Sequence, residues 1–304
     1  MPELLPQFIP QPFVPSGELR TFARNMSIDD HIRQLLEGEA FRQKSFSGLG
    51  FFSKPVRISV EEEDDFVVKV YRAVKEQTRG IDLLIQHDDY VARLQEMGLR
   101  VPETEMKLIP TDKVWVPVIV QAAFADRDLL RNRMIEASEA EYLHYLKAMM
   151  LEVKKYQRYV EQDSAPIGFH PTSRNYAWQN GTLWFFDSFP PMSMDQQSLN
   201  RLILDFAPVK LPLGGLIPTS VVNRVSDEYY QLDKMILGIV GSACRLRPEY
   251  VDAVLAWAQD YAQSSLDGPL QEAVLAGTSA APKLSSLWTN LRKILGKEGK
   301  PNVE

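Results

Sequence analysis

The chain has 304 residues, which is enough for two lobes or domains that each bury a core. Its formal charge of −6 argues against nucleic acid as the main partner, because non-specific nucleic-acid binding needs a basic face. Cys244 is the single cysteine, which excludes an intrachain disulfide and a cysteine-rich zinc site. No signal pattern or membrane-length apolar run is visible, so we expect a cytoplasmic protein without a transmembrane segment.

Residues 1–26 are rich in proline and are expected to form an extended arm. The apolar residues of this arm suggest packing, either on the chain itself or on a protein partner. A helix from Ile28 to Leu36 follows, because Ser27 and Asp30 resemble a capping box and Gly38 supplies a stop.

Alternating apolar residues then predict a small antiparallel sheet, so that residues 27–121 form an N-terminal lobe with a leading helix. The expected order is three strands, one helix and two strands. The strands are expected near 41–47, 56–60, 66–71, 105–109 and 114–121, and the helix from Gln77 or Ile81 to Met97.

Residues 122–267 are expected to form a mainly helical C-terminal lobe. A capping-box pattern from Ser138 to Glu141 opens a long helix that continues to Val160. Two apolar helices are expected near 221–243 and 248–264. The predicted fold class is therefore α+β.

Residues 268–304 are expected to be a linker followed by an amphipathic helix. Residues 268–283 are rich in glycine, alanine and proline, and apolar residues repeat with helical spacing from Leu284 to Leu295. This helix could dock on the chain, pair with another protein or contact a membrane surface.

The segment from Gly168 to Asp187 carries the clearest chemical signal. Asn175 ends a polar turn, and Asp187 follows a short apolar strand twelve residues later. An amide and a carboxylate placed in this way suit Mg²⁺, which prefers one or two protein oxygens together with phosphate and water. The alternatives are a turn residue for Asn175 and a cap on the following proline turn for Asp187.

Three further features point to phosphate. Gly48, Gly50 and Ser53 form a turn that could approach phosphates through backbone N–H groups, although such turns often serve geometry alone. Lys69 lies among valines and needs an anionic partner unless it faces solvent from an edge strand. The helix pattern places His87 or Asp88 inward, with Asp89 one position off. Asp88 is therefore favoured over Asp89 as the acid that pairs with Lys69, although both could be solvated surface acids.

In this order the motifs resemble the protein kinase-like superfamily, especially its aminoglycoside-phosphotransferase-like branch and related bacterial kinase-like proteins, pseudokinases among them. The resemblance spans residues 41–265 and implies a two-lobed kinase-like fold that binds ATP and Mg²⁺. It matches Gly48 to the glycine-rich loop, Lys69 to the third-strand lysine, and Asn175 and Asp187 to the metal ligands. Gln121 falls where an adenine edge would be met.

One departure bears on activity. His170 stands five residues before Asn175, where the family has the aspartate that accepts the substrate proton. General-base help contributes about 10²- to 10⁴-fold, so the change impairs transfer more than binding. His170 could itself act as a base, or it could be a loop residue positioned by Pro171.

We therefore expect a nucleotide-binding pseudokinase or regulatory module. The alternatives are an atypical ATP-dependent small-molecule phosphotransferase or related transferase, and a nucleotide-free scaffold that acts through its N-terminal arm and C-terminal helix.

Overall fold

The computed structural model describes residues 25–37, 53–60, 64–162, 165–206 and 219–283. The chain separates into two compact units, Met1–Lys44 and Ser45–Glu304. In the first unit, helix α1 (Asn25–Glu37) contains the helix expected from Ile28. The second unit contains all other described elements and combines a small antiparallel sheet with helices, which confirms the α+β class.

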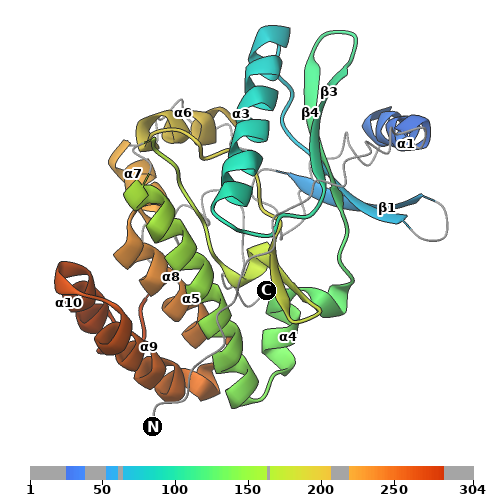
Figure 1. Ribbon diagram of the computed structural model, residues 1–304. Helices are drawn as coiled ribbons and strands as arrows, with labels where there is room; N and C mark the ends of the chain where they lie inside the picture. Colours follow the sequence, from blue (N-terminus) through green and yellow to red (C-terminus); the bar gives the residue numbers. More distant parts are fainter. Residues whose placement is uncertain (1–24, 38–52, 61–63, 163–164, 207–218, 284–304) are drawn as a thin grey trace. The chain divides into compact units, whose positions relative to one another are not determined.

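The sheet of the second unit has four strands in the order β1-β2-β4-β3, and all neighbours are antiparallel (Figure 1). Helix α3 packs against β3 and β4 and follows β2 in the chain. The bounds are β1 (Lys54–Val60), β2 (Asp64–Val70), α3 (Gln77–Glu96), β3 (Thr104–Pro110) and β4 (Trp115–Ala122).

The register of the sheet decides which side chains share the face beneath α3. Lys69 lies opposite Ile119, and Ile119 lies opposite Met106, so all three side chains point to the same face. Leu83 of α3 packs with Ile119 and Met106 in one apolar cluster. Helix and sheet approach closely at Gly80, where a Cβ atom would lie 2.5 Å from a methyl carbon of Leu108.

Most remaining elements are helices around a two-stranded hairpin. They are α4 (Leu130–Glu136), α5 (Glu139–Gln162), β5 (Tyr176–Gln179), β6 (Thr182–Phe185), α6 (Gln196–Phe206), α7 (Thr219–Tyr230), α8 (Leu232–Leu246), α9 (Val251–Ser265) and α10 (Gly268–Gly277). Short 3₁₀ turns occur at η1 (Asp126–Asp128), η2 (Ser173–Asn175) and η4 (Pro248–Tyr250). One large apolar core, drawn from α3, α5, α8, α9 and the hairpin, fills this part.

The capping box of α5 is confirmed. Ser138 Oγ lies 2.6 Å from Glu141 Oε2, and the backbone N–H of Ser138 donates to the same oxygen at 3.0 Å. The N-terminal end of the long helix therefore lies where the sequence places it.

The single helix expected at 221–243 is wrong, because the chain forms α7 and α8 with a break at Gln231. Gln231 has an extended backbone, with φ −103° and ψ 119°. The carbonyl of Tyr229 accepts a hydrogen bond from the N–H of Phe169 at 2.8 Å. This contact from a distant segment occupies a carbonyl at the end of α7.

The linker expected at 268–283 is also wrong in its first part, because 268–277 form α10. Gly268 has a φ of 53°, which suits glycine, and Pro269 occupies the first turn, where its missing N–H costs nothing. Val274 of α10 is fully buried. The proline-rich arm, the strand expected near 41–47 and the helix from Leu284 lie outside the described residues.

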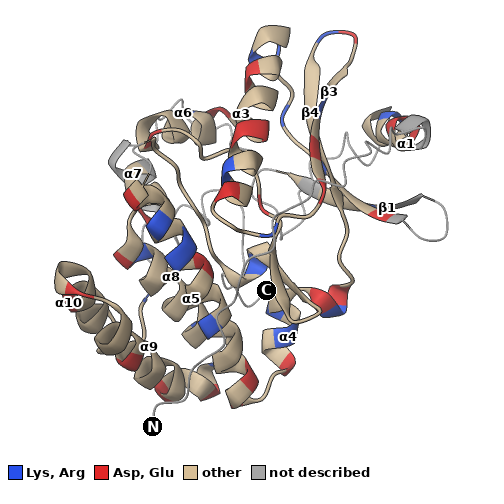
Figure 2. Cartoon of the chain, viewed as in Figure 1, with Lys and Arg blue, Asp and Glu red and all other residues tan. Residues whose placement is uncertain are grey.

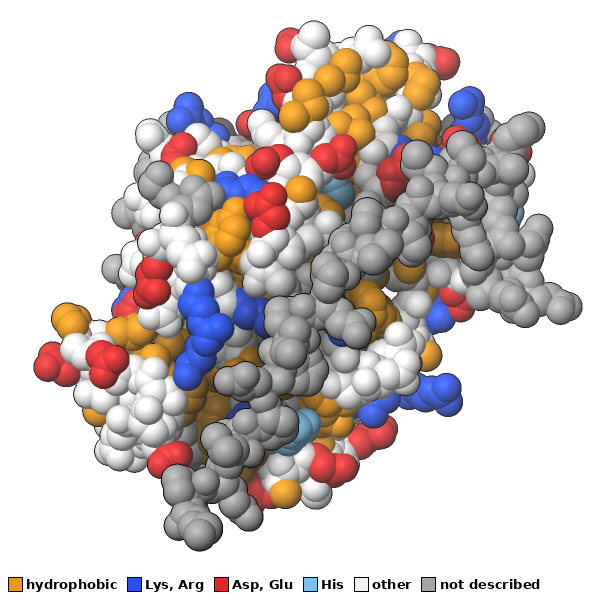
Figure 3. Space-filling model, viewed as in Figure 1, with side chains coloured by type: hydrophobic (Ala, Val, Ile, Leu, Met, Phe, Trp, Pro, Cys, Tyr) orange, Lys and Arg blue, Asp and Glu red, His pale blue; other side chains and the backbone are white. Residues whose placement is uncertain are grey.

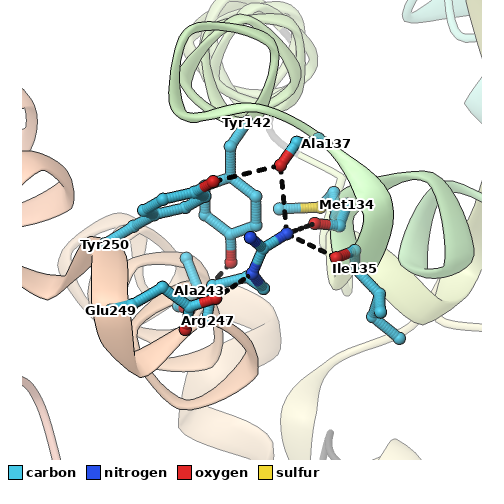
Figure 4. A network of polar contacts seen from close by, with 8 residues as sticks. All are labelled: Met134, Ile135, Ala137, Tyr142, Ala243, Arg247, Glu249 and Tyr250. Carbon is cyan, nitrogen blue, oxygen red and sulfur yellow. Dashed lines mark hydrogen bonds and ion pairs between the residues drawn. The ribbon is translucent and has the colours of Figure 1, made fainter.

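Arg247 joins the C-terminal end of α4 to α8 (Figure 4). Its Nη1 donates to the carbonyl oxygens of Met134 and Ala137, each at 3.1 Å, and also to that of Ile135. Tyr250 Oη donates to the Ala137 carbonyl at 3.2 Å. The guanidinium thereby satisfies carbonyls that the end of a short helix leaves unpaired.

The surface view shows apolar side chains over the end of α3 and the β3–β4 hairpin (Figure 3). On α3, Ile81 and Ile85 are 43% and 63% exposed. Acidic and basic residues are mixed along α3 and α4 (Figure 2). Within the part of the chain that the structure describes, no helix has the length and hydropathy to cross a bilayer.

Candidate functional site

The loop before His170 is held by helices on several sides. Its backbone groups are paired in a way that fixes the path of the chain toward Asn175. The contacts are Tyr156 Oη to Ile167 O (3.0 Å), Tyr90 Oη to Gly168 O (3.2 Å), Gly168 N to Met192 O (2.8 Å) and Phe169 N to Tyr229 O (2.8 Å). Tyrosines of α3 and α5 and the end of α7 therefore position this loop.

Asn175 lies at the end of η2, and the residue is 8% exposed. The Nδ2 group donates to the carbonyl of His170 at 3.0 Å, and the amide also hydrogen-bonds the carboxylate of Asp187. A carbonyl and a carboxylate only accept, so both N–H protons are used and Oδ1 remains an acceptor. The backbone N–H of Phe186 donates to the Asn175 carbonyl at 2.9 Å, which closes the hairpin and brings the amide to Asp187.

Asp187 lies two residues after the end of β6 and is half-buried. Burial raises the pKa of its carboxyl group, while Lys69, the N–H of Phe189 and the amide of Asn175 lower it. Desolvation outweighs these favourable contacts. A carboxylate in this position would gain from a cation placed beside it.

Lys69 lies on the face of β2 that α3 covers. Its Nζ donates to Phe186 O at 2.9 Å and to Gln121 Oε1 at 3.1 Å, and it lies 5.6 Å from the centre of the Phe186 ring. Burial lowers the pKa of the ammonium, and the charge of Asp187 raises it. The alternative of a lysine facing solvent from an edge strand is wrong, because β2 is paired with β1 and β4.

The expected partner of Lys69 on α3 is wrong. The Asp88 side chain is 71% exposed, and Asp89 is also exposed. His87 is the inward residue instead, with no exposed surface, and its Nε2 lies 2.9 Å from Ser188 Oγ. Successive residues of a helix point in directions 100° apart, so His87 lies on the buried face of α3 while the next residue, Asp88, lies on its surface.

Gln121 does not present an edge to a ligand through its side chain. The residue is 3% exposed, and both ends of its amide are used. Oε1 accepts from Lys69, and Nε2 donates to Thr104 Oγ1 at 2.8 Å. The sequence pattern placed Gln121 near the end of β4, as the structure has it, and the structure assigns the side chain to Lys69 and Thr104.

His170 packs its ring against Tyr229, with 4.6 Å between ring centres. Burial lowers its pKa to about 4, so the imidazole is neutral at pH 7. Asn175 Nδ2 lies 3.4 Å from His170 Nδ1. The site therefore has a weak, uncharged base here.

Of the glycine turn expected from Gly48 to Ser53, the structure describes only the last residue, Ser53. Gly48 and Gly50 lie outside the described residues. Ser53 is buried, and its hydroxyl hydrogen-bonds the phenol of Tyr71. The Tyr71 ring contacts Phe189 in a tilted arrangement, with 3.9 Å between ring centres.

The sequence gave no role in the site to four residues beside it, although the helix pattern allowed His87 to point inward. The rings of Tyr71 and Phe189 contact each other in the apolar cluster beneath α3, while His87 and Ser188 join α3 to the chain after Asp187. The available signal was position: Tyr71 directly follows the strand that contains Lys69, and Ser188 and Phe189 directly follow Asp187.

In the ranges that the structure describes, no three histidine, cysteine, aspartate or glutamate residues gather as a metal site. A cation would therefore rely on Asn175 Oδ1, the Asp187 carboxylate and oxygens from a ligand or water. This donor set fits Mg²⁺, which keeps several non-protein ligands.

A family model described as a family of unknown function, DUF6206, matches residues 28–299. The chain belongs to this family. The DUF6206 match takes in the sheet, the hairpin and the helices, and includes Lys69, Asn175 and Asp187. No curated protein matches the chain.

Proposed function

We propose that this DUF6206 protein has a two-lobed kinase-like fold and binds ATP with Mg²⁺, and that its phosphotransferase activity is lost or altered. The observation that carries the proposal is the contact between Lys69 and the segment just after β6, which contains Asp187. Lys69 Nζ bonds the carbonyl of Phe186 across 117 residues of sequence. A lysine, an amide and a carboxylate from three different elements thereby converge.

The topology of the sheet supports the fold. The strand with Lys69 is followed by α3, then by β3 and β4, and the sheet order β1-β2-β4-β3 places β4 next to the lysine strand. The resemblance to the kinase-like superfamily implies this arrangement for its smaller lobe. The helices after β4 correspond to the larger lobe.

The charges support a phosphate ligand. The ammonium of Lys69 offers one positive charge to phosphate oxygens. The oxygens of Asn175 and Asp187 suit a magnesium ion. When bound, Mg²⁺ would neutralise phosphate charge and stabilise the ionised carboxylate. Lys69 itself would bind and orient phosphate oxygens.

The protonation state of His170 affects phosphoryl transfer but not nucleotide binding. A neutral imidazole with a pKa of about 4 supplies no negative charge and accepts a proton weakly. Binding through Lys69 and Asp187 does not depend on this residue. We therefore place nucleotide binding first and phosphoryl transfer second.

A thermal-shift and calorimetric titration with ATP and Mg²⁺ tests the proposal. At a ligand concentration 100 times Kd, binding stabilises the folded protein by about 2.7 kcal/mol. Lys69→Ala and Asp187→Ala should each reduce affinity at least tenfold, whereas Lys234→Ala, at an exposed position of α8, should not.

Three outcomes separate the rival functions. Absence of any ATP-dependent shift in the parent protein overturns the proposal and leaves the nucleotide-free scaffold. ATP turnover that disappears in His170→Ala makes the protein an atypical phosphotransferase. Binding without turnover supports a pseudokinase or regulatory module.

A further inference from the structure

We propose that Gln121 and Thr104 are positioning residues that aim the ammonium of Lys69 at an anionic ligand without neutralising it. The inference rests on the proposed function, because it describes how the same site would hold phosphate. It assigns a task to two residues that do not themselves touch the ligand.

The hydroxyl of Thr104 fixes which end of the Gln121 amide faces Lys69. Its hydroxyl donates its single proton to the carbonyl of Pro102 at 2.7 Å. Oγ1 can therefore only accept from Gln121, whose Nε2 lies 2.8 Å away. This contact turns Oε1 of the amide toward Lys69 Nζ, 3.1 Å distant.

The relay is built on paired strands. Thr104 and Gln121 are directly opposite one another in β3 and β4, so their side chains share a face. Gln121 also lies opposite Val67 of β2, two residues from Lys69. The three side chains are thus set by the register of three neighbouring strands, which is more rigid than a loop.

Both acceptors of Lys69 are neutral: the amide oxygen of Gln121 and the carbonyl of Phe186. An ammonium has three N–H groups, so one remains for a ligand. Asp187 acts on Lys69 through its charge, but among the described residues no ion pair within 4 Å joins the two. The positive charge is therefore available to an anion.

The remaining titratable neighbour from α3 is also uncharged. Burial and the nearby charge of Lys69 lower the pKa of His87 to about 4, while Asp88 raises it. Neither α3 nor β4 supplies a carboxylate in contact with the ammonium. A glutamate in place of Gln121 would supply one without a change in size.

The first experiment measures the ammonium without any nucleotide. In protein labelled with ¹³C-lysine, the Cε signal absent from Lys69→Arg reports the pKa of Lys69. This pKa should be higher in Gln121→Glu than in the parent and should not rise in Gln121→Met. An unchanged pKa in Gln121→Glu would show that residue 121 does not act on Lys69 and would overturn the proposal.

The same variants then separate positioning from packing. Gln121→Glu should weaken ATP binding about tenfold or more, because its carboxylate competes with phosphate for Lys69. ATP affinity of Gln121→Glu equal to that of the parent contradicts the inference. If the parent binds no ATP, the proposed function fails, while the Lys69 titration still decides whether the relay acts on the ammonium.

Thr104 offers a matched pair of variants. Thr104→Ser keeps the hydroxyl and should bind ATP as the parent does. Thr104→Val keeps the shape but frees the Gln121 amide to rotate, and should weaken binding about tenfold. Equal ATP affinity of the two variants overturns the relay, and should Thr104→Val fail to fold, the Gln121 comparison decides alone.

Discussion

His87 Nε2 lies 2.9 Å from Ser188 Oγ, so a fully buried imidazole of α3 is joined to the residue that follows Asp187. The contact links the helix over the sheet to the carboxylate of the candidate site. Because the imidazole is neutral in the folded protein, the link depends on pH.

The pKa of His87 predicts a loss of stability in mild acid. The unfolded chain takes up a proton near pH 6.5, and folded His87 only near pH 4. The free energy of unfolding therefore falls as pH drops from 6.5 toward 4, and His87 accounts for about 2 kcal/mol between pH 7 and pH 5. Urea unfolding at the two pH values measures this loss.

His87→Gln is the control for that experiment, since it keeps a partner for Ser188 and removes the titration. The variant should lose less stability between pH 7 and pH 5 than the parent. His170, whose pKa is also about 4, should supply the part that remains. An identical loss in parent and variant would exclude His87 as a source.

Asp187→Asn is expected to stabilise the ligand-free protein at neutral pH. Burial raises the pKa of Asp187, so the folded state disfavours its ionised form. The gain is present above the folded pKa and disappears as pH falls below the ordinary value near 3.9, where the carboxyl is protonated in both states. Thermal unfolding of parent and variant should show the gain at pH 7 and its loss at pH 3.5. Asp260→Asn, on the surface of α9, controls for the loss of one charge.

Arg247→Ala should destabilise the protein by about 1.5–3 kcal/mol, because carbonyls at the end of α4 lose their charged donor. Arg247→Lys should recover only part of this loss, since an ammonium lacks the planar fork of the guanidinium. Glu249 is 55% exposed, so Glu249→Ala should change stability little. Chemical unfolding of the three variants ranks them, and an equal loss in all three would contradict the assignment.

Two buried tyrosines give a matched comparison. Tyr156 Oη donates to the Ile167 carbonyl at 3.0 Å, whereas Tyr176 Oη is buried without a hydrogen-bond partner among the described residues. Tyr156→Phe should cost about 1–3 kcal/mol, because it leaves a buried carbonyl unpaired. Tyr176→Phe should be neutral or stabilising, and the reverse order of midpoints in urea would contradict these assignments.

Periodicity identified the parts of the fold that local sequence controls. The alternation from Val56 to Val60 and the apolar run from Phe66 to Tyr71 predicted the first hairpin, and the Ser138–Glu141 capping box predicted the start of α5. The same reasoning placed Lys69 on an apolar strand and Asp187 at a strand end. Each of these features depends on residues close together in the chain.

The errors came from contacts between distant residues or from small differences of phase. Asp88 and His87 differ by one helical position, which the apolar spacing of α3 does not resolve. The break between α7 and α8 coincides with the hydrogen bond from Phe169 to Tyr229, which no local pattern reveals. In α10, composition suggested a linker, but burial of Val274 against other helices favours a helix.

The order of synthesis has a consequence for the site. Lys69 leaves the ribosome 117 residues before the Phe186 carbonyl that it bonds, and Met134 precedes its partner Arg247 by 113 residues. At about 5–20 residues per second, Lys69 waits on the order of ten seconds for its acceptor at Phe186. Helix α4, which packs against the η2 turn of Asn175, waits as long for Arg247. A nascent chain halted before Phe186 would therefore lack one acceptor of the Lys69 ammonium, and a chain halted before Arg247 would leave exposed the end of α4 that the complete protein covers.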